Sequence, residues 1–129
     1  MTKKAATALR SAWAQSLLDQ LGPNHRIRFY NGTQPADISA AHTGTLLGTL
    51  TADSTPGSVV SGVLTFDTAN YSQTSGSHVN GTPTYMSLET NGGTRIYELG
   101  TADGLTFTGT IQNGVDIARN AWSWTAPDA

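Results

Sequence analysis

The sequence predicts a mainly β protein, an antiparallel β-sandwich or small barrel of about six or seven strands with one N-terminal α-helix. Three observations predict this class. Apolar and polar residues alternate in several short segments, turn residues separate those segments, and helical spacing is confined to residues 5–21. Gly, Ser, Thr and Asn take the place of charged residues, which form only 12% of the chain against about 25% in an average domain.

The segment from about residue 5 to residue 21 has the spacing of an amphipathic helix. Its apolar side chains recur every three or four positions and are expected on one face: Ala6, Leu9, Trp13, Leu17 and Leu21. Gly22 can adopt the left-handed conformation that ends a helix, and Pro23 cannot continue one. We therefore expect residues 1–23 to pack on, or dock from, a β-sandwich domain of residues 24–129, within a single domain overall.

The first predicted strand runs from Arg26 to Tyr30, because Ile27 and Phe29 alternate with residues that point the other way. Asn31 and Gly32 then supply a turn. Further strands are expected at about residues 45–51, 59–67, 84–90, 94–99, 105–111 and 118–125.

Three of the later segments carry more specific expectations. The strand at 59–67 is expected to place four residues on one face: Val60, Gly62, Leu64 and Phe66. Asn91, Gly92 and Gly93 predict a hairpin turn between the strands at 84–90 and 94–99. The polar segment 68–81 predicts either a surface loop or a region that is ordered only against a partner.

The histidines and carboxylates predict no reactive site. His25, His42 and His78 lack the close spacing of metal-binding pairs, so each is expected to be solvated or hydrogen-bonded locally. The carboxylates are scattered over strand ends and turns, among them Asp37, Asp53, Asp67, Glu89, Glu98, Asp103 and Asp116. No Gly-x-Ser-x-Gly elbow, Walker loop or dinucleotide-binding fingerprint occurs. We therefore expect a protein that is not an enzyme, with no catalytic residue, cofactor or metal.

Composition limits the classes of partner. Seven Lys and Arg residues against nine Asp and Glu residues leave no basic stripe, which argues against nucleic acid as a partner. No segment approaches the roughly 20 apolar residues that span a bilayer, so no membrane partner is expected. Cysteine is absent, so the fold depends on packing and hydrogen bonds. The low charge favours close packing against neighbours, although a Thr-rich β surface explains it equally well.

Two groups of residues are candidate contact surfaces. Lys3 and Lys4 at the start of the helix, together with Arg10, could meet an acidic partner, although a solvated terminus explains the two lysines as well. Trp122 and Trp124 lie two residues apart and therefore share one strand face. They could stack on a sugar, anchor an interface or fill the core.

Three segments together resemble a family of small tailed-bacteriophage virion proteins: Arg26–Ala36, Thr43–Thr51 and Gly62–Leu64. Family members similarly have an N-terminal helix, a strand that ends in a turn and a proline, a Thr-Gly-Thr-Leu-Leu strand and a later hairpin. The resemblance covers most of residues 5–125, and no single motif in it is chemically diagnostic. This chain departs from the family pattern in its polar 72–81 loop and in Trp122 and Trp124, where smaller β-formers are usual.

The resemblance implies a non-enzymatic structural component of a tailed-phage virion, made in the host cytoplasm and assembled as a homo-oligomer. A collar or head–tail connector subunit is the leading expectation, with copies of itself and portal, connector or capsid proteins as partners. A capsid decoration, or cement, protein is the alternative. A carbohydrate- or receptor-binding β-module is the rival class, and its site would be formed by Trp122, Trp124 and the 72–81 loop.

Overall fold

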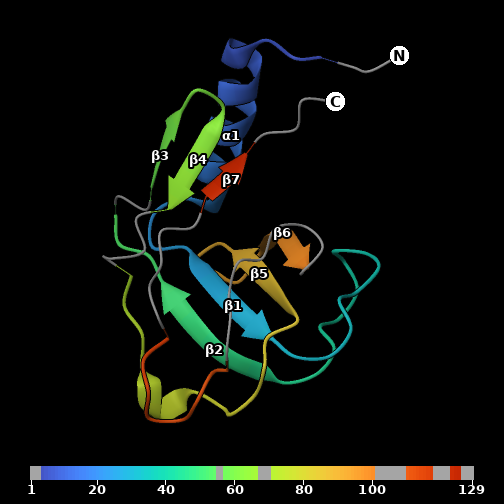
Figure 1. The fold of residues 1–129 in the computed structure, drawn as a ribbon, viewed down its shortest axis with the longest axis vertical. Coiled ribbons are helices and arrows are strands. Elements are labelled where there is room, and N and C mark those ends of the chain that lie inside the picture. Colours follow the sequence, from blue (N-terminus) through green and yellow to red (C-terminus); the bar gives the residue numbers. More distant parts are fainter. Residues whose placement is uncertain (1–3, 55–56, 67–70, 101–109, 118–122, 126–129) are drawn as a thin grey trace.

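Two antiparallel sheets and an N-terminal helix form the protein (Figure 1). The structure, a computed structural model, describes residues 4–54, 57–66, 71–100, 110–117 and 123–125. Within these residues the chain forms seven strands in a sandwich-like fold, which confirms the predicted fold class. Most of the strand expected at 105–111, and the first half of the strand expected at 118–125, lie outside the described residues.

The larger sheet has the strand order β2-β1-β5-β6. Its strands are Arg26–Tyr30 (β1), Leu46–Thr51 (β2), Tyr85–Glu89 (β5) and Arg95–Gly100 (β6). Each neighbouring pair is antiparallel, and β1 coincides with the predicted strand. The predicted β5–β6 hairpin is confirmed, and the Gly93 N–H closes its turn by donating to the Thr90 carbonyl at 3.0 Å.

The smaller sheet has the order β3-β4-β7, with strands Gly57–Val60, Val63–Phe66 and Ser123–Thr125. The prediction of a single strand at 59–67 is therefore wrong. The chain reverses at Ser61 and Gly62, whose φ angles of +50° and +81° are both in the left-handed region that a two-residue hairpin requires. As a result Leu64 is buried as expected, whereas Val60 lies at the hairpin tip and is 70% exposed.

Helix α1 (Thr7–Leu21) packs on β3 and β4. It ends as predicted at Gly22, whose N–H donates to the Leu18 carbonyl at 3.1 Å. Its buried side chains are Ala14, Leu17 and Leu21. The C-terminal half of the helix is thereby built into the core.

The N-terminal half of α1 departs from the predicted apolar face. Leu9 and Trp13 are 46% and 40% exposed, so they are not buried against the β domain. Half-buried Arg10 occupies the contact instead, because it lies over the β3–β4 turn: a Cβ on Gly62 would come within 3.0 Å of the Arg10 Cβ. The Gly62 N–H also donates to the Ser11 hydroxyl at 2.9 Å. Polar contacts with the hairpin turn therefore displace the two large apolar side chains toward solvent.

One hydrophobic core joins the helix and both sheets. Ile27 and Phe29 of β1 are fully buried in it, as their alternation predicts. Leu21 from α1, Leu64 from β4 and Leu88 from β5 belong to the same cluster. This shared core holds the two sheets together although no hydrogen-bonded strand pair links them in the described part of the chain.

The polar segment expected at 68–81 is attached to the larger sheet from residue 71 onward. Ser72 exchanges two backbone hydrogen bonds with Thr51 at the outer edge of β2. Gly81 forms an isolated bridge with Ile111. Residues 71–81 are therefore ordered by the protein's own β2 and 110–117 segment.

Candidate functional site

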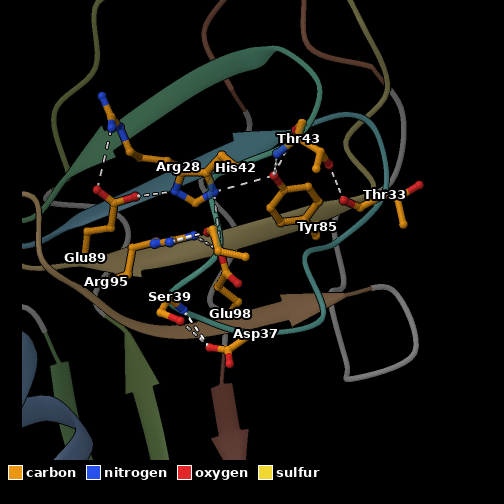
Figure 2. Close-up of polar contacts among 11 residues, drawn as sticks. Arg28, Thr33, Asp37, Ser39, His42, Thr43, Tyr85, Glu89, Arg95 and Glu98 are labelled. Carbon is orange, nitrogen blue, oxygen red and sulfur yellow. Dashed lines mark hydrogen bonds and ion pairs between the residues drawn. The ribbon is translucent and has the colours of Figure 1, made fainter.

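The polar face of the larger sheet is the candidate site, because it carries charged groups and is covered. Alternate residues of β1 and β5 point to this face: Arg26, Arg28, Tyr30, Tyr85, Ser87 and Glu89. Residues 31–45, which connect β1 to β2 and which we call the strap, cross it (Figure 2). Every residue of β5 is buried, since the core covers one face of the sheet and the strap covers the other.

Four side chains of the sheet and His42 of the strap form a chain of contacts at ion-pair distance, which we call the charged cluster: Arg28, Glu89, His42, Glu98 and Arg95. The two Glu89 oxygens lie 3.6 Å from Arg28 Nη1 and 3.4 Å from His42 Nε2. Glu98 Oε2 lies 3.4 Å from both His42 Nδ1 and Arg95 Nη1. The strap's His42 is thus held between carboxylates from two neighbouring strands (Figure 2).

The two carboxylates of the cluster have little access to water. The side chains of Glu89 and Glu98 are 2% and 4% exposed. A carboxylate that has lost its water depends on its cationic partners, so removing one partner of a buried pair costs about 3–5 kcal/mol. Hydrogen bonding beneath the strap is incomplete. Glu89 Oε2 is close to His42 but forms no hydrogen bond with it. Ser87 Oγ is buried without a partner among the described residues.

Two tyrosines fix the strap next to the cluster. The Tyr85 hydroxyl accepts from the Thr43 N–H at 3.1 Å and donates to the Thr43 carbonyl at 2.9 Å. The Tyr30 ring stacks on the His42 imidazole, with ring centroids 4.1 Å apart. Burial raises the pKa of Tyr30, and the positive charge of Arg28 partly opposes that rise. The phenol therefore remains a neutral partner of the imidazole over the physiological range.

The geometry of the cluster suits holding the strap better than proton transfer. A general acid or base must reach a substrate, but each carboxylate here faces an arginine beneath the strap. Arg95 also donates to the Ala40 carbonyl, which ties a second point of the strap to β6. The described clefts at Thr49 and at Gln112 are lined by residues outside the cluster.

The expectation of solvated or locally bonded histidines is wrong for His42 and His78, whereas His25 does have a local contact with the Gly22 carbonyl. His42 belongs to the charged cluster, and His25 and His78 are buried. His25 Nδ1 lies 3.3 Å from the Gly22 carbonyl, and Nε2 lies 2.7 Å from the Tyr71 hydroxyl. Burial lowers the pKa of His25, and the hydrogen bond with the Gly22 carbonyl opposes this effect. A neutral imidazole with one donor and one acceptor nitrogen satisfies both contacts.

Sequence reasoning missed the charged cluster, because its members come from distant parts of the chain. The alternation of β1 places Arg28 opposite the core, and the hairpin brings Glu89 next to Arg95. Those two signals predict a charged sheet face. Nothing in the local pattern shows that His42 and the strap cover that face.

The structure leaves the predicted contact residues separate from the charged cluster. Lys4 is exposed before the start of α1, and Arg10 is half-buried on the helix. Lys3 and Trp122 lie outside the described residues. The backbone of Trp124 lies in β7, but its side chain is outside the description as well. A role for these residues in an interface stays a prediction.

Comparisons with known proteins give no relative. No protein-family model matches this chain, and no curated protein or solved structure is significantly similar to it. Among the described residues, no helix is long and apolar enough to cross a membrane. Within the same residues, no group of three or more His, Cys, Asp and Glu side chains is placed to hold a metal ion.

Proposed function

We propose that this protein is a non-enzymatic structural component of a tailed-phage virion, a collar or head–tail connector subunit that acts through multivalent protein–protein packing. The family resemblance of residues 26–64 suggests the particle. The observation that supports the packing role is that α1 has both buried and exposed large apolar side chains. One side of the helix is anchored in the core, and another side presents two large apolar residues to solvent.

The exposed residues of α1 have the properties of an interface anchor. Leu9 and Trp13 are one helical turn apart and therefore adjacent on the helix surface. Large aromatic side chains supply much of the binding energy in protein interfaces when a partner covers them. Because Leu17 and Leu21 fix the helix in the core, little conformational freedom is lost when such a partner binds.

The distribution of charge also supports a packing role. Four of the few charged residues are used inside the charged cluster: Arg28, Glu89, Arg95 and Glu98. The remaining surface has fewer ions that must lose water at a contact. On a symmetric particle, modest contacts are multiplied over many identical copies. The lysines near the N-terminus favour an acidic portal or connector surface as the partner, whereas a decoration protein would bind the capsid shell.

The test is incorporation into particles. Deleting residues 1–21 would remove three core side chains, so the exposed pair is changed instead. We expect the double variant Leu9→Ser/Trp13→Ser to fold but to be lost from purified virions, as measured by quantitative mass spectrometry with circular dichroism of the free protein. Ala12→Ser, at another exposed position of α1, is the matched control and should be retained.

Two outcomes would contradict the proposal. A folded Leu9→Ser/Trp13→Ser variant that enters virions at the wild-type copy number would exclude α1 as the packing element. A wild-type protein that never enters virions would exclude the structural role itself. Cryo-electron microscopy of particles that contain the protein distinguishes a position at the collar from one on the capsid surface.

A further inference from the structure

The smaller sheet ends in a strand whose outer side makes no backbone hydrogen bond to any other described residue. β3 lies at the margin of this sheet, next to β4 (Figure 1). The β2 edge of the larger sheet is occupied instead, because Ser72 and Val79 bond to its backbone. No described residue bonds in this way to the outer side of β3. We call this side the β3 edge.

Gly57 and Val59 present their backbone groups at the β3 edge. The two-residue turn after β3 makes Val60 and Val63 a hydrogen-bonded pair, so the N–H and C=O groups of Val60 point toward β4. Peptide groups alternate along a strand, so those of Ser58 also point inward and those of Val59 and Gly57 point outward. The β3 edge therefore offers the N–H donor and the C=O acceptor of both residues.

The β3 edge has none of three features that commonly block strand edges. Exposed edges are often protected by a charged side chain, a proline or a β-bulge. β3 has the sequence Gly-Ser-Val-Val, its pairing with β4 is regular, and no charged residue occurs in the described strands of the smaller sheet. A second strand can therefore pair with β3 without taking a charge of this sheet out of water.

We propose that β3 pairs with β3 of a second copy of this chain, in antiparallel orientation, across a two-fold axis that passes beside Ser58. In this register Gly57 of each copy lies opposite Val59 of the other, and each such pair exchanges both of its backbone hydrogen bonds. Every outward group of both strands is then satisfied. The β3 edge is thus self-complementary, and the choice of a second copy as its occupant rests on the proposed multi-copy packing role.

The side chains of β3 fit this register on both faces of the sheet. Gly57 has no side chain, and a Cβ there would lie 2.5 Å from the Thr65 carbonyl oxygen, so Val59 of the second copy meets open space at this position. On the other face Ser58 is exposed and lies opposite Ser58 of the second copy. Two hydroxyl groups at directly opposite positions can bond to each other.

The position of α1 also fits a second copy. α1 packs on both β3 and β4, so its axis runs over the space between these strands. A two-fold axis perpendicular to the sheet places both helices on the same face, antiparallel and two strand spacings apart, which is about 10 Å. Helices pack against each other at distances of about 8–10 Å. The two helices are therefore expected to make a second contact behind the joined sheet.

The first test is self-association of the purified full chain, measured by analytical ultracentrifugation over a range of protein concentrations. We expect a reversible equilibrium between monomer and dimer for the wild type. Val59→Pro removes an outward N–H but no bond to β4, and proline is accepted on edge strands. This variant should therefore fold, as circular dichroism can show, and stay monomeric.

A pair of charge variants tests the two-fold register. Ser58→Lys and Ser58→Glu each place like charges opposite each other, and each should weaken self-association about two- to fivefold. An equimolar mixture of the two variants should regain the association, because opposite charges then face each other. Thr65→Lys is the matched control, since it puts the same charge on the same exposed face but one strand farther from the β3 edge, and it should change the association little.

Hydrogen exchange locates the contact. The Val59 amide points outward, so it should exchange more slowly as the protein concentration rises and the second copy binds. The Val60 amide is bonded to β4 in each copy, so its exchange should depend much less on concentration.

Three results would overturn the pairing: a wild type that sediments as a monomer up to about 1 mM, a folded Val59→Pro variant that dimerises as tightly as the wild type, or a mixture of the charge variants that regains no association. Val59 also packs on the core, so the charge variants keep the test decisive if Val59→Pro unfolds. Protection of the Val59 amide only by a different virion protein would also overturn it.

Failure of this inference is distinguishable from failure of the proposed function. A monomeric wild type that enters virions contradicts the β3 pairing alone. A wild-type dimer that never enters virions contradicts the virion role alone.

Discussion

The strap and residues 73–78, which we call the edge loop, are two polar segments that pack on the same sheet and are held by different kinds of contact. The strap crosses the face of the sheet, where His42 is paired with two buried carboxylates. The edge loop follows the rim of β2, where Gln73 and Asn113 supply neutral amide hydrogen bonds. Both segments are rich in small polar residues, so their composition does not account for the difference.

The position of each segment on the sheet explains why the two segments are held by different kinds of contact. Backbone N–H and C=O groups of a strand point sideways within the sheet, so a face offers only side chains to a segment that crosses it. An edge offers unpaired backbone groups that neutral partners can satisfy. The strap must therefore be fixed by side chains, and alternation along β1, β5 and β6 supplies charged ones. The residues that flank the edge loop, Ser72 and Val79, are bonded to the backbone of Thr51 and Leu47.

The largest predicted effect is a loss of stability when a charged residue that helps to hold the strap is replaced. Arg28→Met leaves the Glu89 carboxylate buried with His42 as its remaining partner, and we expect a loss of about 3 kcal/mol in the free energy of unfolding. Urea denaturation at pH 7 measures it. The double variant Arg28→Met/Glu89→Met removes both charges and should recover most of the loss. A single variant that costs less than about 1 kcal/mol would show that the pair behaves as an exposed surface pair.

The second prediction uses the neutral imidazole at the base of the edge loop, where His25 is bonded to Tyr71. Burial lowers the pKa of His25 in the folded state, so the unfolded state takes up the proton first as the pH falls. The contribution to stability is complete above the unfolded pKa of about 6.5 and decreases as the pH falls through it, by at most about 1.4 kcal/mol per pH unit.

The measurement for His25 is the free energy of unfolding of the wild type and of His25→Gln between about pH 7.5 and pH 5. The variant should lose stability less steeply as the pH falls. The comparison of slopes removes the constant cost of losing the Tyr71 hydrogen bond. Parallel curves for the two proteins would mean that protonation of His25 has no part in acid destabilisation.

A smaller effect is expected from the amide network of the edge loop. Gln73→Ala removes two hydrogen bonds to the Ile117 backbone and should cost about 1–2 kcal/mol, measured by thermal denaturation. Ser72→Ala, which loses only a long 3.4 Å contact to the Thr51 carbonyl, is the control and should change little. If Gln73→Ala is as harmful as Arg28→Met, the neutral network is as sensitive as the charged one and the contrast fails.

The smallest expected effect concerns salt. Buried ion pairs are screened much less than exposed ones. The stability difference between the wild type and Arg28→Met/Glu89→Met should therefore change by less than about 0.5 kcal/mol between low and high sodium chloride. A larger change in urea denaturation would show that water and ions reach the charged cluster beneath the strap.

Local signals were enough for much of the fold. The alternation in residues 26–30 predicted β1, and the pair Gly22 and Pro23 predicted the end of α1. The Asn91–Gly93 turn predicted the β5–β6 hairpin. The β3–β4 turn was missed, because Ser61 and Gly62 lie inside a run of β-forming residues without an Asn-Gly or Asp-Gly pair.

The sequence by itself determined which segments extend or coil and which face of each strand is apolar, because those properties depend on neighbours within a few positions. Only the tertiary structure decided what covers each face and edge. His42 meets Glu89 and Glu98, and His78 meets Gly48 and Val115, through strand pairings that join residues far apart in the chain. Alternation shows that a residue points away from the core, but it holds no information about which distant segment lies there.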